Sequence, residues 1–328
     1  MAIAEALDLQ APVVSRQPRR FRFVRQLLRK KVASVALVII LAFYVVGIFA
    51  PLVAPYDPNK SPNPLTAEDR LAGPSADHWF GTDRLGRDLM SRVFFAARTT
   101  VLFTVVIVVT GGVFLSVGLG LLAGYRGGWV DTLIMRVGEV LASMPTLVLM
   151  LAITAAFRPR ITQFSFDLAD NTPLNTDDAR AIVQFLVIVG AALPFAWIGG
   201  ARIVRAQALG IRESAFVEAA EASGASTWRV ITRHILPGTM PLFWVGVSGA
   251  MAGIALAEVS LSFLGLGISP PAASFGTLIA DGAGPRAVQN NPHLLLAAAT
   301  PVVLFFLAWN LLGDALVDIL EPKATNEP

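Results

Sequence analysis

The chain has 328 residues, of which 55% are hydrophobic and only 15% are charged. Soluble domains carry about 25% charged residues, so this composition indicates a membrane protein and excludes disordered and collagen-like chains. The absence of cysteine excludes disulfide scaffolds, cysteine-ligated metal centres and thiol catalysis. The net charge of +3 does not indicate nucleic acid as a partner, because many arginines lie beside apolar segments, where lipid headgroups account for them.

Six apolar segments approach the length of about 20 residues that crosses about 30 Å of hydrocarbon as a helix. The predicted spans are 32–53, 99–124, 140–157, 181–201, 235–257 and 294–313. The third is expected to belong to one helix that begins near Val130. A further apolar stretch, 259–280, contains two glycines and two prolines in close succession, and we predict a turn or re-entrant loop there.

Glycines recur at four-residue spacing in two of these spans. The pairs are Gly120 with Gly124 and Gly249 with Gly253. Because glycine lets two helix backbones approach closely, both pairs are predicted to pack against protein rather than lipid.

Basic residues gather directly before the first span. They are Arg16, Arg19, Arg20, Arg22, Arg25, Arg29, Lys30 and Lys31. Such residues favour the cytoplasmic side, so we expect a cytoplasmic N-terminus and, after six crossings, a cytoplasmic C-terminus. The first span exceeds the 7 to 15 apolar residues, roughly, of a signal peptide, which indicates an uncleaved anchor.

This topology divides the chain into four parts. Residues 1–31 form a cytoplasmic tail, 32–92 the first span and an extracytoplasmic segment, 93–320 the core, and 321–328 a second cytoplasmic tail. Within the core, residues 213–237 are cytoplasmic, and residues 158–180 are predicted to form an extracytoplasmic loop for which the sequence offers no explanation.

The polar break between the fourth and fifth spans, residues 213–237, is predicted to hold two short helices. Ser214 can cap a helix over 215–223, Gly224 can end it, and Ser226 can cap a second helix that stops at Pro237. Small side chains at such a protruding tip suit insertion into a groove of another protein.

The pattern Glu218-Ala219-Ala220, then Gly224-Ala225, then Leu236-Pro237 resembles the EAA loop of binding-protein-dependent ATP-binding cassette (ABC) importer permeases. The resemblance implies that this loop docks on a cytoplasmic ATPase. His234 departs from the isoleucine of the looser consensus, as in the peptide and nickel branch of the family.

A second segment resembles the signature of the C-type permease subunit of dipeptide, oligopeptide and nickel importers. It runs Gly81-Thr82-Asp83-Arg84-Leu85-Gly86-Arg87-Asp88 after His78-Trp79-Phe80. Its charges admit two interpretations: ion pairs of Asp83 and Asp88 with Arg84 and Arg87 that fix a loop, or contact with a substrate-delivering protein.

The resemblance implies an all-α membrane protein with the type I importer (MetI-like) permease fold, located in a bacterial inner membrane. It implies a heterodimer with a homologous second permease, two P-loop ATPases that bind ATP and Mg²⁺, and an extracytoplasmic substrate-binding protein. This chain itself has no Gly-Lys pair and hence no P-loop, so we expect neither enzyme activity nor a bound cofactor or metal. Di- and oligopeptides are the expected solutes, with nickel or another small solute as the alternative.

Three charged residues within or beside the spans keep other classes open. Arg136 and Glu139 lie three residues apart on one helix face and can neutralise each other, whereas Glu258 is expected near the outer boundary, within reach of water. Glu139 and Glu258 could instead serve a pathway or gate, as in an ion-coupled secondary carrier. That class predicts an inverted repeat, which the sequence does not show, and a membrane hydrolase predicts a nucleophile set, which does not stand out.

Overall fold

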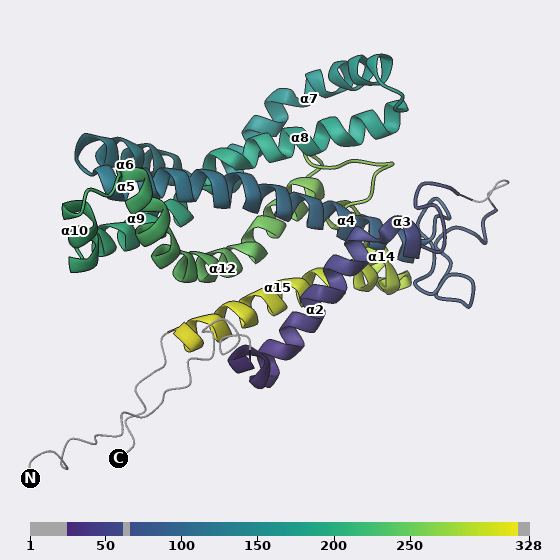
Figure 1. Ribbon diagram of the computed structural model, residues 1–328. Coiled ribbons are helices and arrows are strands. Elements are labelled where there is room, and N and C mark those ends of the chain that lie inside the picture. Colours follow the sequence, from purple (N-terminus) through teal and green to yellow (C-terminus); the bar gives the residue numbers. More distant parts are fainter. Residues whose placement is uncertain (1–24, 62–65, 321–328) are drawn as a thin grey trace, which may run out of the picture.

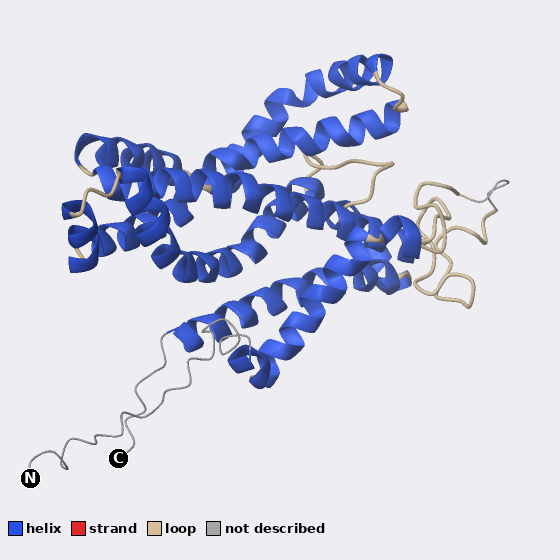
Figure 2. Ribbon diagram, in the orientation of Figure 1, coloured by secondary structure: helices blue, strands red, loops and turns tan. Residues whose placement is uncertain are grey.

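The computed structural model describes residues 25–61 and 66–320, and these are mostly helical (Figure 2). Within these ranges the only β pairing is an isolated bridge between Thr82 and Asp88. The predicted all-α class is therefore confirmed. Most of both predicted tails, including Arg16, Arg19, Arg20 and Arg22, lies outside the described residues.

Six described helices are long and apolar enough to cross a bilayer. Several of them consist of consecutive elements. In chain order they comprise α2 (Lys31–Ile48); α4 (Leu89–Ile107), the π-helical η1 (Val108–Val117) and α5 (Gly118–Arg126); α7 (Thr146–Asn171); α8 (Thr176–Ala196) and α9 (Ile198–Arg212); α11 (Thr227–Val230), η2 (Ile231–Ile235) and α12 (Leu236–Phe263); and α15 (Pro292–Leu320).

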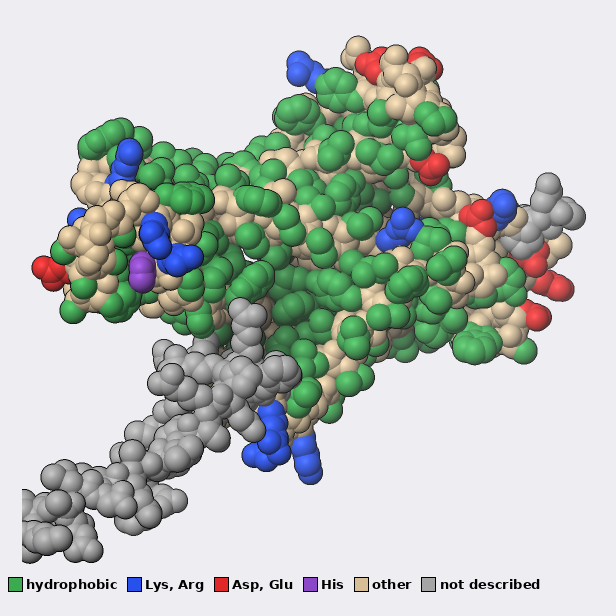
Figure 3. All heavy atoms as spheres, in the orientation of Figure 1, with side chains coloured by type: hydrophobic (Ala, Val, Ile, Leu, Met, Phe, Trp, Pro, Cys, Tyr) green, Lys and Arg blue, Asp and Glu red, His purple; other side chains and the backbone are tan. Residues whose placement is uncertain are grey.

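The surface of the bundle is apolar over most of its length. Figure 3 shows hydrophobic side chains across the middle of the visible face, with most acidic and basic side chains toward its ends and edges. On α2, Val38 and Leu41 are both about two-thirds exposed. Such contiguous apolar surface is unfavourable in water but costs nothing against hydrocarbon, which supports a multi-pass membrane protein.

The prediction that the third span belongs to one helix beginning near Val130 is wrong, because two helices cover this stretch. Helix α6 (Gly128–Ala142) stops before Ser143, and α7 begins after Pro145. A proline disfavours helical backbone in the preceding residue, here Met144, which explains the interruption.

The predicted loop over 158–180 is also wrong. Helix α7 continues through Pro159 to Asn171 and α8 begins at Thr176, so the two form a hairpin with a short turn. The side chain of Asn175 caps α8 by accepting from the amide of Asp178 at 2.8 Å. The polar composition of this stretch marks where the apolar segment ends, not where the helix ends.

The predicted break within 259–280 is confirmed and has a helix after it. Helix α12 ends at Phe263, turns follow, and α13 (Phe275–Gly282) packs on α12 and α15. A Cβ on Gly276 would lie 2.2 Å from the carbonyl oxygen of Val259, so only glycine permits this contact. Phe43 and Phe305 pack beside α13, with ring centroids 4.4 Å apart.

The two glycine pairs differ. Cβ atoms on Gly120 and Gly124 would each lie 2.7 Å from a side chain of α9, so the predicted close packing is confirmed there. Cβ atoms on Gly249 and Gly253 would meet nothing within 4 Å, so these positions do not require glycine for space, although α12 itself packs against α9, α13 and α15 as predicted.

The bundle has two distinct ends (Figure 1). At one end α10 (Ala215–Ala222) lies beside α5, α6 and α9; we call this the α10 end. At the other end α3 (Ala50–Val53) and α14 (Pro285–Asn290) lie beside the loops that precede α4; we call this the α3 end. The two segments that carry the family resemblance, residues 81–88 and 213–237, therefore lie at opposite ends of the molecule.

Candidate functional site

The segment that resembles the EAA loop, residues 213–237, begins after α9 and holds the two predicted short helices, α10 and α11. We call it the coupling loop after that resemblance. Ser214 and Ser226 occupy the N-cap positions, as predicted, but neither side chain caps its helix. The Ser214 hydroxyl instead donates to the carbonyl of Ile211 at 2.5 Å. This bond holds the chain at the point where it leaves α9.

Gly224 ends α10, as predicted. The amide of Ala225 donates to the carbonyl of Ala220 at 3.0 Å, and that of Gly224 donates to Glu221 at 2.9 Å. These two bonds form a Schellman motif, which requires left-handed backbone at Gly224, where φ is +81°. Glycine is favoured here for its backbone and not for space, because a Cβ would touch nothing within 4 Å.

Two kinds of contact fix the coupling loop to the bundle. Val217 and Val230 are fully buried in a cluster with residues of α5, α9 and α12. On the rim of this cluster, Arg212 donates to the carbonyl of Tyr125 at 2.8 Å, and the Tyr125 hydroxyl donates to Glu221 at 3.1 Å. Glu221, rather than Glu218, is thus the acidic residue that anchors the loop within this chain.

The outward face of the coupling loop presents an acidic side chain without a polar partner among the described residues. The Glu218 carboxylate is exposed and makes no hydrogen bond or ion pair there, and Ala219 and Gly224 are exposed beside it. Phe216 is 55% and Trp228 75% exposed. The sequence analysis missed both rings, although aromatic residues among the small and charged residues of a polar loop were the available signal.

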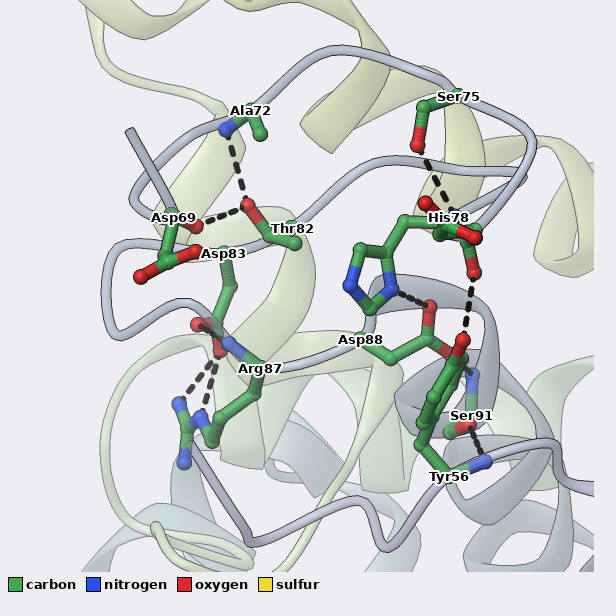
Figure 4. A network of polar contacts seen from close by, with 11 residues as sticks. Tyr56, Asp69, Ala72, Ser75, His78, Thr82, Asp83, Arg87, Asp88 and Ser91 are labelled. Atoms are coloured by element: carbon green, nitrogen blue, oxygen red, sulfur yellow. Dashed lines mark hydrogen bonds and ion pairs between the residues drawn. The ribbon is translucent and has the colours of Figure 1, made fainter. Parts of the chain in front are cut away.

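The signature segment, residues 81–88, is a compact, hydrogen-bonded turn at the α3 end (Figure 4). We call this turn the knot, without implying that the chain is topologically knotted. It begins and turns at Gly81 and Gly86, whose φ values are +79° and +71°. The Asp83 amide donates to the carbonyl of Arg87 at 3.0 Å, which closes the turn. A Cβ on Gly81 would lie 2.4 Å from the carbonyl oxygen of Ala72, so the knot excludes other residues there.

Asp83 is the centre of this knot. Its carboxylate accepts from Nε of Arg87 at 2.7 Å, from the amides of Leu85 and Arg87, and pairs with Arg92 at 3.4 Å. The side chains of all three charged residues are almost fully buried. The expectation that Arg84 joins an ion pair here is wrong, since it donates to the carbonyl of Asp281 at 2.7 Å instead.

Asp88 links the knot to α4. One of its oxygens accepts from the amide of Ser91 at 2.7 Å and so caps the helix, and the other lies 2.9 Å from Nδ1 of His78. The predicted pairing of Asp88 with Arg87 is therefore wrong. The reason is that α4 begins directly after Asp88 and uses its carboxylate as a cap.

Thr82 joins the knot to the preceding loop. Its hydroxyl donates to the carbonyl of Asp69 at 2.6 Å and accepts from the amide of Ala72 at 2.9 Å. Hydrogen bonds from the hydroxyl and amide of Thr66 lower the pKa of the Asp69 carboxyl below its ordinary value. Only Arg84 and Leu85 of the signature segment are exposed.

The structure places the two candidate pathway residues differently. Glu139 pairs with Arg136 at 2.9 Å on an exposed face of α6, as the spacing predicted. Glu258 is fully buried, so the expectation that it is reachable by water is wrong. It accepts from the hydroxyls of Ser274, Thr100 and Ser262 at 2.8, 3.0 and 3.1 Å, and thereby ties α12 to α4 and to the start of α13.

A cavity of about 430 Å³ opens between α4, η1, α7, α8, α9 and α12. Its wall is mostly apolar and includes Phe103, Met150, Phe195, Phe243 and Ile254. Gly253 also lines it, so the open space beside that glycine belongs to this chamber. The sequence analysis did not find the chamber, because apolar lining residues and lipid-facing residues look alike in a sequence.

The sequence profile of the binding-protein-dependent transport system inner membrane component matches residues 116–326, and the N-terminal transmembrane domain of oligopeptide transport permease C matches residues 21–74. The chain belongs to this family of transport permeases. Among curated relatives, it is 33% identical to the dipeptide transport system permease protein DppC of Alkalihalophilus pseudofirmus, over 91% of this chain and 88% of the relative.

Other relatives have related names. The permease is 36% identical to the probable D,D-dipeptide transport system permease protein DdpC of Escherichia coli, over 88% of this chain and 86% of the relative. It is 32% identical to the glutathione transport system permease protein GsiD of Pectobacterium atrosepticum, over 92% and 90%. Both resemblance assignments of the sequence analysis are thereby confirmed at the level of the family, and the chain is a multi-pass membrane transport subunit.

Proposed function

We propose that this permease pairs with a homologous second permease to form the path by which an ATP-driven importer takes up di- or oligopeptides. The observation that carries the proposal is the coupling loop: a rigidly anchored pair of short helices whose outward face is left without partners. The relatives named for dipeptide, D,D-dipeptide and glutathione transport support the solute class.

In this proposal the α10 end is cytoplasmic and docks on a P-loop ATPase through Glu218, Ala219, Ala220, Gly224 and Ala225. Two such ATPases bind ATP and Mg²⁺, and their closure moves the coupling loop. Because α9 and α12 continue directly from that loop, its displacement biases the bundle between inward-open and outward-open states. The α3 end then faces an extracytoplasmic substrate-binding protein in a bacterial inner membrane, and both termini are cytoplasmic.

The signature segment has a structural role in this scheme, because both of its carboxylates and both of its arginines make bonds within the chain. Arg84 and Leu85 are the exposed residues of the segment, so they are the ones that can contact a binding protein. Glu139 and Glu258 serve the fold rather than a proton or ion path, since one is paired on the surface and the other is enclosed by hydroxyls.

The chamber favours peptides over nickel as the solute. Nickel binds nitrogen, oxygen or thiolate ligands, whereas the chamber wall consists mainly of aromatic, aliphatic and glycine residues. Its two hydroxyl side chains are Thr146 and Ser116, and the Ser116 hydroxyl is bonded to backbone carbonyls. Such a wall accommodates side chains of different size without holding any of them tightly, as a path for many peptides requires.

The test is uptake of a labelled dipeptide, alanyl-phenylalanine, by proteoliposomes that contain the complex purified through a tag on this chain. Uptake that needs both internal ATP and the binding protein supports the proposal. Uptake by this chain alone, driven by an ion gradient without ATP, would overturn it in favour of a secondary carrier.

A further inference from the structure

A second, polar cavity of about 280 Å³ lies between the α7–α8 hairpin and the turn after α12. Both sides of the hairpin contribute to its wall, as do the glycines and serine of the turn. The polar side chains that line it are Thr154, Arg158, Thr162, Arg180, Gln184 and Ser269. The function assigned to the chamber and to the two motifs does not use this cavity.

The cavity carries positive charge without a matching carboxylate. Arg158 comes from α7 and Arg180 from α8, so the two guanidinium groups approach from opposite sides of the hairpin. Neither arginine makes an ion pair or a hydrogen bond with the described residues. The aspartates of the hairpin lie toward its turn and do not line the cavity; they are Asp167, Asp170, Asp177 and Asp178.

The remaining wall is fixed. Gln184 is buried and binds Ser269 twice: its amide nitrogen lies 2.5 Å from the serine hydroxyl, and its oxygen accepts from the serine amide at 3.1 Å. These bonds clamp the turn after α12 to α8. The hydroxyl of Thr154 donates to the carbonyl of Met150 at 2.9 Å and is likewise held. The two arginines and the hydroxyl of Thr162 are therefore the polar groups of the cavity that make no side-chain bond with the described residues, and the arginines are the charged ones among them.

The polar cavity follows the chamber along the same two helices. On α7, Met150 lines the chamber and Thr154, one turn later, lines the polar cavity. On α8, Ala192 lines the chamber and Gln184, two turns earlier, lines the polar cavity. Ile188 lies between Gln184 and Ala192 on α8, and with Leu261 and Ile268 it belongs to the buried apolar cluster that also holds Met150 and Ala192 of the chamber wall. The polar cavity and the chamber thus follow one another along α7 and α8, with buried apolar side chains beside them.

We propose that the polar cavity binds a carboxylate of the transported solute, such as the C-terminus of a peptide, before the solute enters the chamber. A planar guanidinium group donates two parallel hydrogen bonds to a carboxylate and remains charged at every physiological pH. In this proposal two guanidinium groups on facing helices bind the terminal carboxylate of the peptide and do not recognise its side chains. This inference rests on the proposed function, which supplies the solute.

The test is direct binding to the purified full chain in nanodiscs of phosphatidylcholine, with saturation-transfer NMR as the readout. The probes are alanyl-phenylalanine and its C-terminal amide, which differ in the carboxylate alone. We expect the free acid to bind at least fivefold more tightly than the amide. Arg158→Gln combined with Arg180→Gln should abolish this difference, whereas Arg160→Gln, on the same helix but outside the cavity, should retain it.

In phosphatidylcholine nanodiscs, three results would overturn the inference: equal binding of acid and amide by the native chain, an unchanged preference in the double variant, or loss of the preference in the Arg160→Gln control. Nanodiscs that also contain phosphatidylglycerol distinguish a lipid phosphate as the occupant. If that lipid displaces the free acid completely, the cavity is a headgroup site and the inference fails. Because the readout needs no ATPase, these outcomes are separate from a failure of ATP-driven uptake.

Discussion

The two ends of the molecule use their motif residues in opposite ways. At the α3 end, Asp83, Arg87 and Asp88 are buried, and each bonds to another part of the chain. At the α10 end, the side chains of Glu218 and Trp228 are exposed and without polar partners in the described chain. The contrast teaches that one motif builds the subunit and the other is left available for a partner.

The largest effect is expected from Asp83→Asn, which leaves Arg87 and Arg92 buried without a countercharge. Removal of one partner from a buried ion pair costs about 3–5 kcal/mol of folding free energy. We expect loss of the chain from the membrane fraction, or a melting temperature in detergent well below that of the native chain. Asp77→Asn, at an exposed position before the knot, is the matched control and should be neutral. Equal stability of the two variants would show that the knot does not support the fold.

Glu258 allows a graded test at the same end. Glu258→Gln keeps an acceptor for the hydroxyls of Ser262 and Ser274, so we expect a change below about 1 kcal/mol. Glu258→Ala removes all three hydrogen bonds and opens a void, with an expected cost of about 2–4 kcal/mol. Thermal unfolding of both variants in the same detergent measures the difference. An intact fold with abolished uptake in Glu258→Gln would instead restore Glu258 as a pathway residue.

At the α10 end, Gly224→Ala should separate coupling from folding. Left-handed backbone costs a residue with a Cβ about 1–2 kcal/mol, so the end of α10 is expected to unwind while the bundle stays intact. We expect co-purification of the ATPases to fall at least tenfold. The control is Gly210→Ala in α9, where a Cβ also meets open space but the backbone is helical. Equal ATPase recovery from both variants would remove Gly224 from the coupling site.

The smallest effect on stability is expected from Trp228→Ala. Its ring is 75% exposed, so truncation should change the free energy of unfolding of the isolated subunit by less than about 0.5 kcal/mol and leave its melting temperature almost unchanged. The same change should weaken ATPase association severalfold, because aromatic side chains contribute strongly to interfaces. Native ATPase affinity in this variant would show that the exposed ring faces lipid or solvent and not a partner.

Local signals in the sequence were sufficient for the class of fold and for the ends of short elements. Uninterrupted apolar runs predicted the spans, and Gly224 predicted the end of α10 because the left-handed position is a property of the chain itself. Charge partners were not predictable in this way. Asp83 pairs with Arg92, and Asp88 with His78, because the fold brings these residues together, although Arg84 and Arg87 lie closer to both aspartates in the sequence.

The α7–α8 hairpin shows a second limit. Its residues are polar enough to end an apolar segment, yet the helix continues, because a helix satisfies its own backbone hydrogen bonds whether its side chains are apolar or polar. The cavity between the hairpin and the turn after α12 joins residues as distant in sequence as Arg158 and Ser269. No spacing rule relates such residues, so only the folded chain reveals the site.

The central claim is that the coupling loop faces a cytoplasmic ATPase, and site-directed cross-linking tests it most directly. The chain has no cysteine, so Ala219→Cys and Leu85→Cys each introduce a single reactive thiol, one at each end. We predict that a maleimide benzophenone on residue 219 cross-links to a P-loop ATPase and that a membrane-impermeant maleimide labels residue 85, but not residue 219, in intact cells. Labelling of residue 219 from outside, or cross-linking of the ATPase to residue 85 instead, would contradict the account.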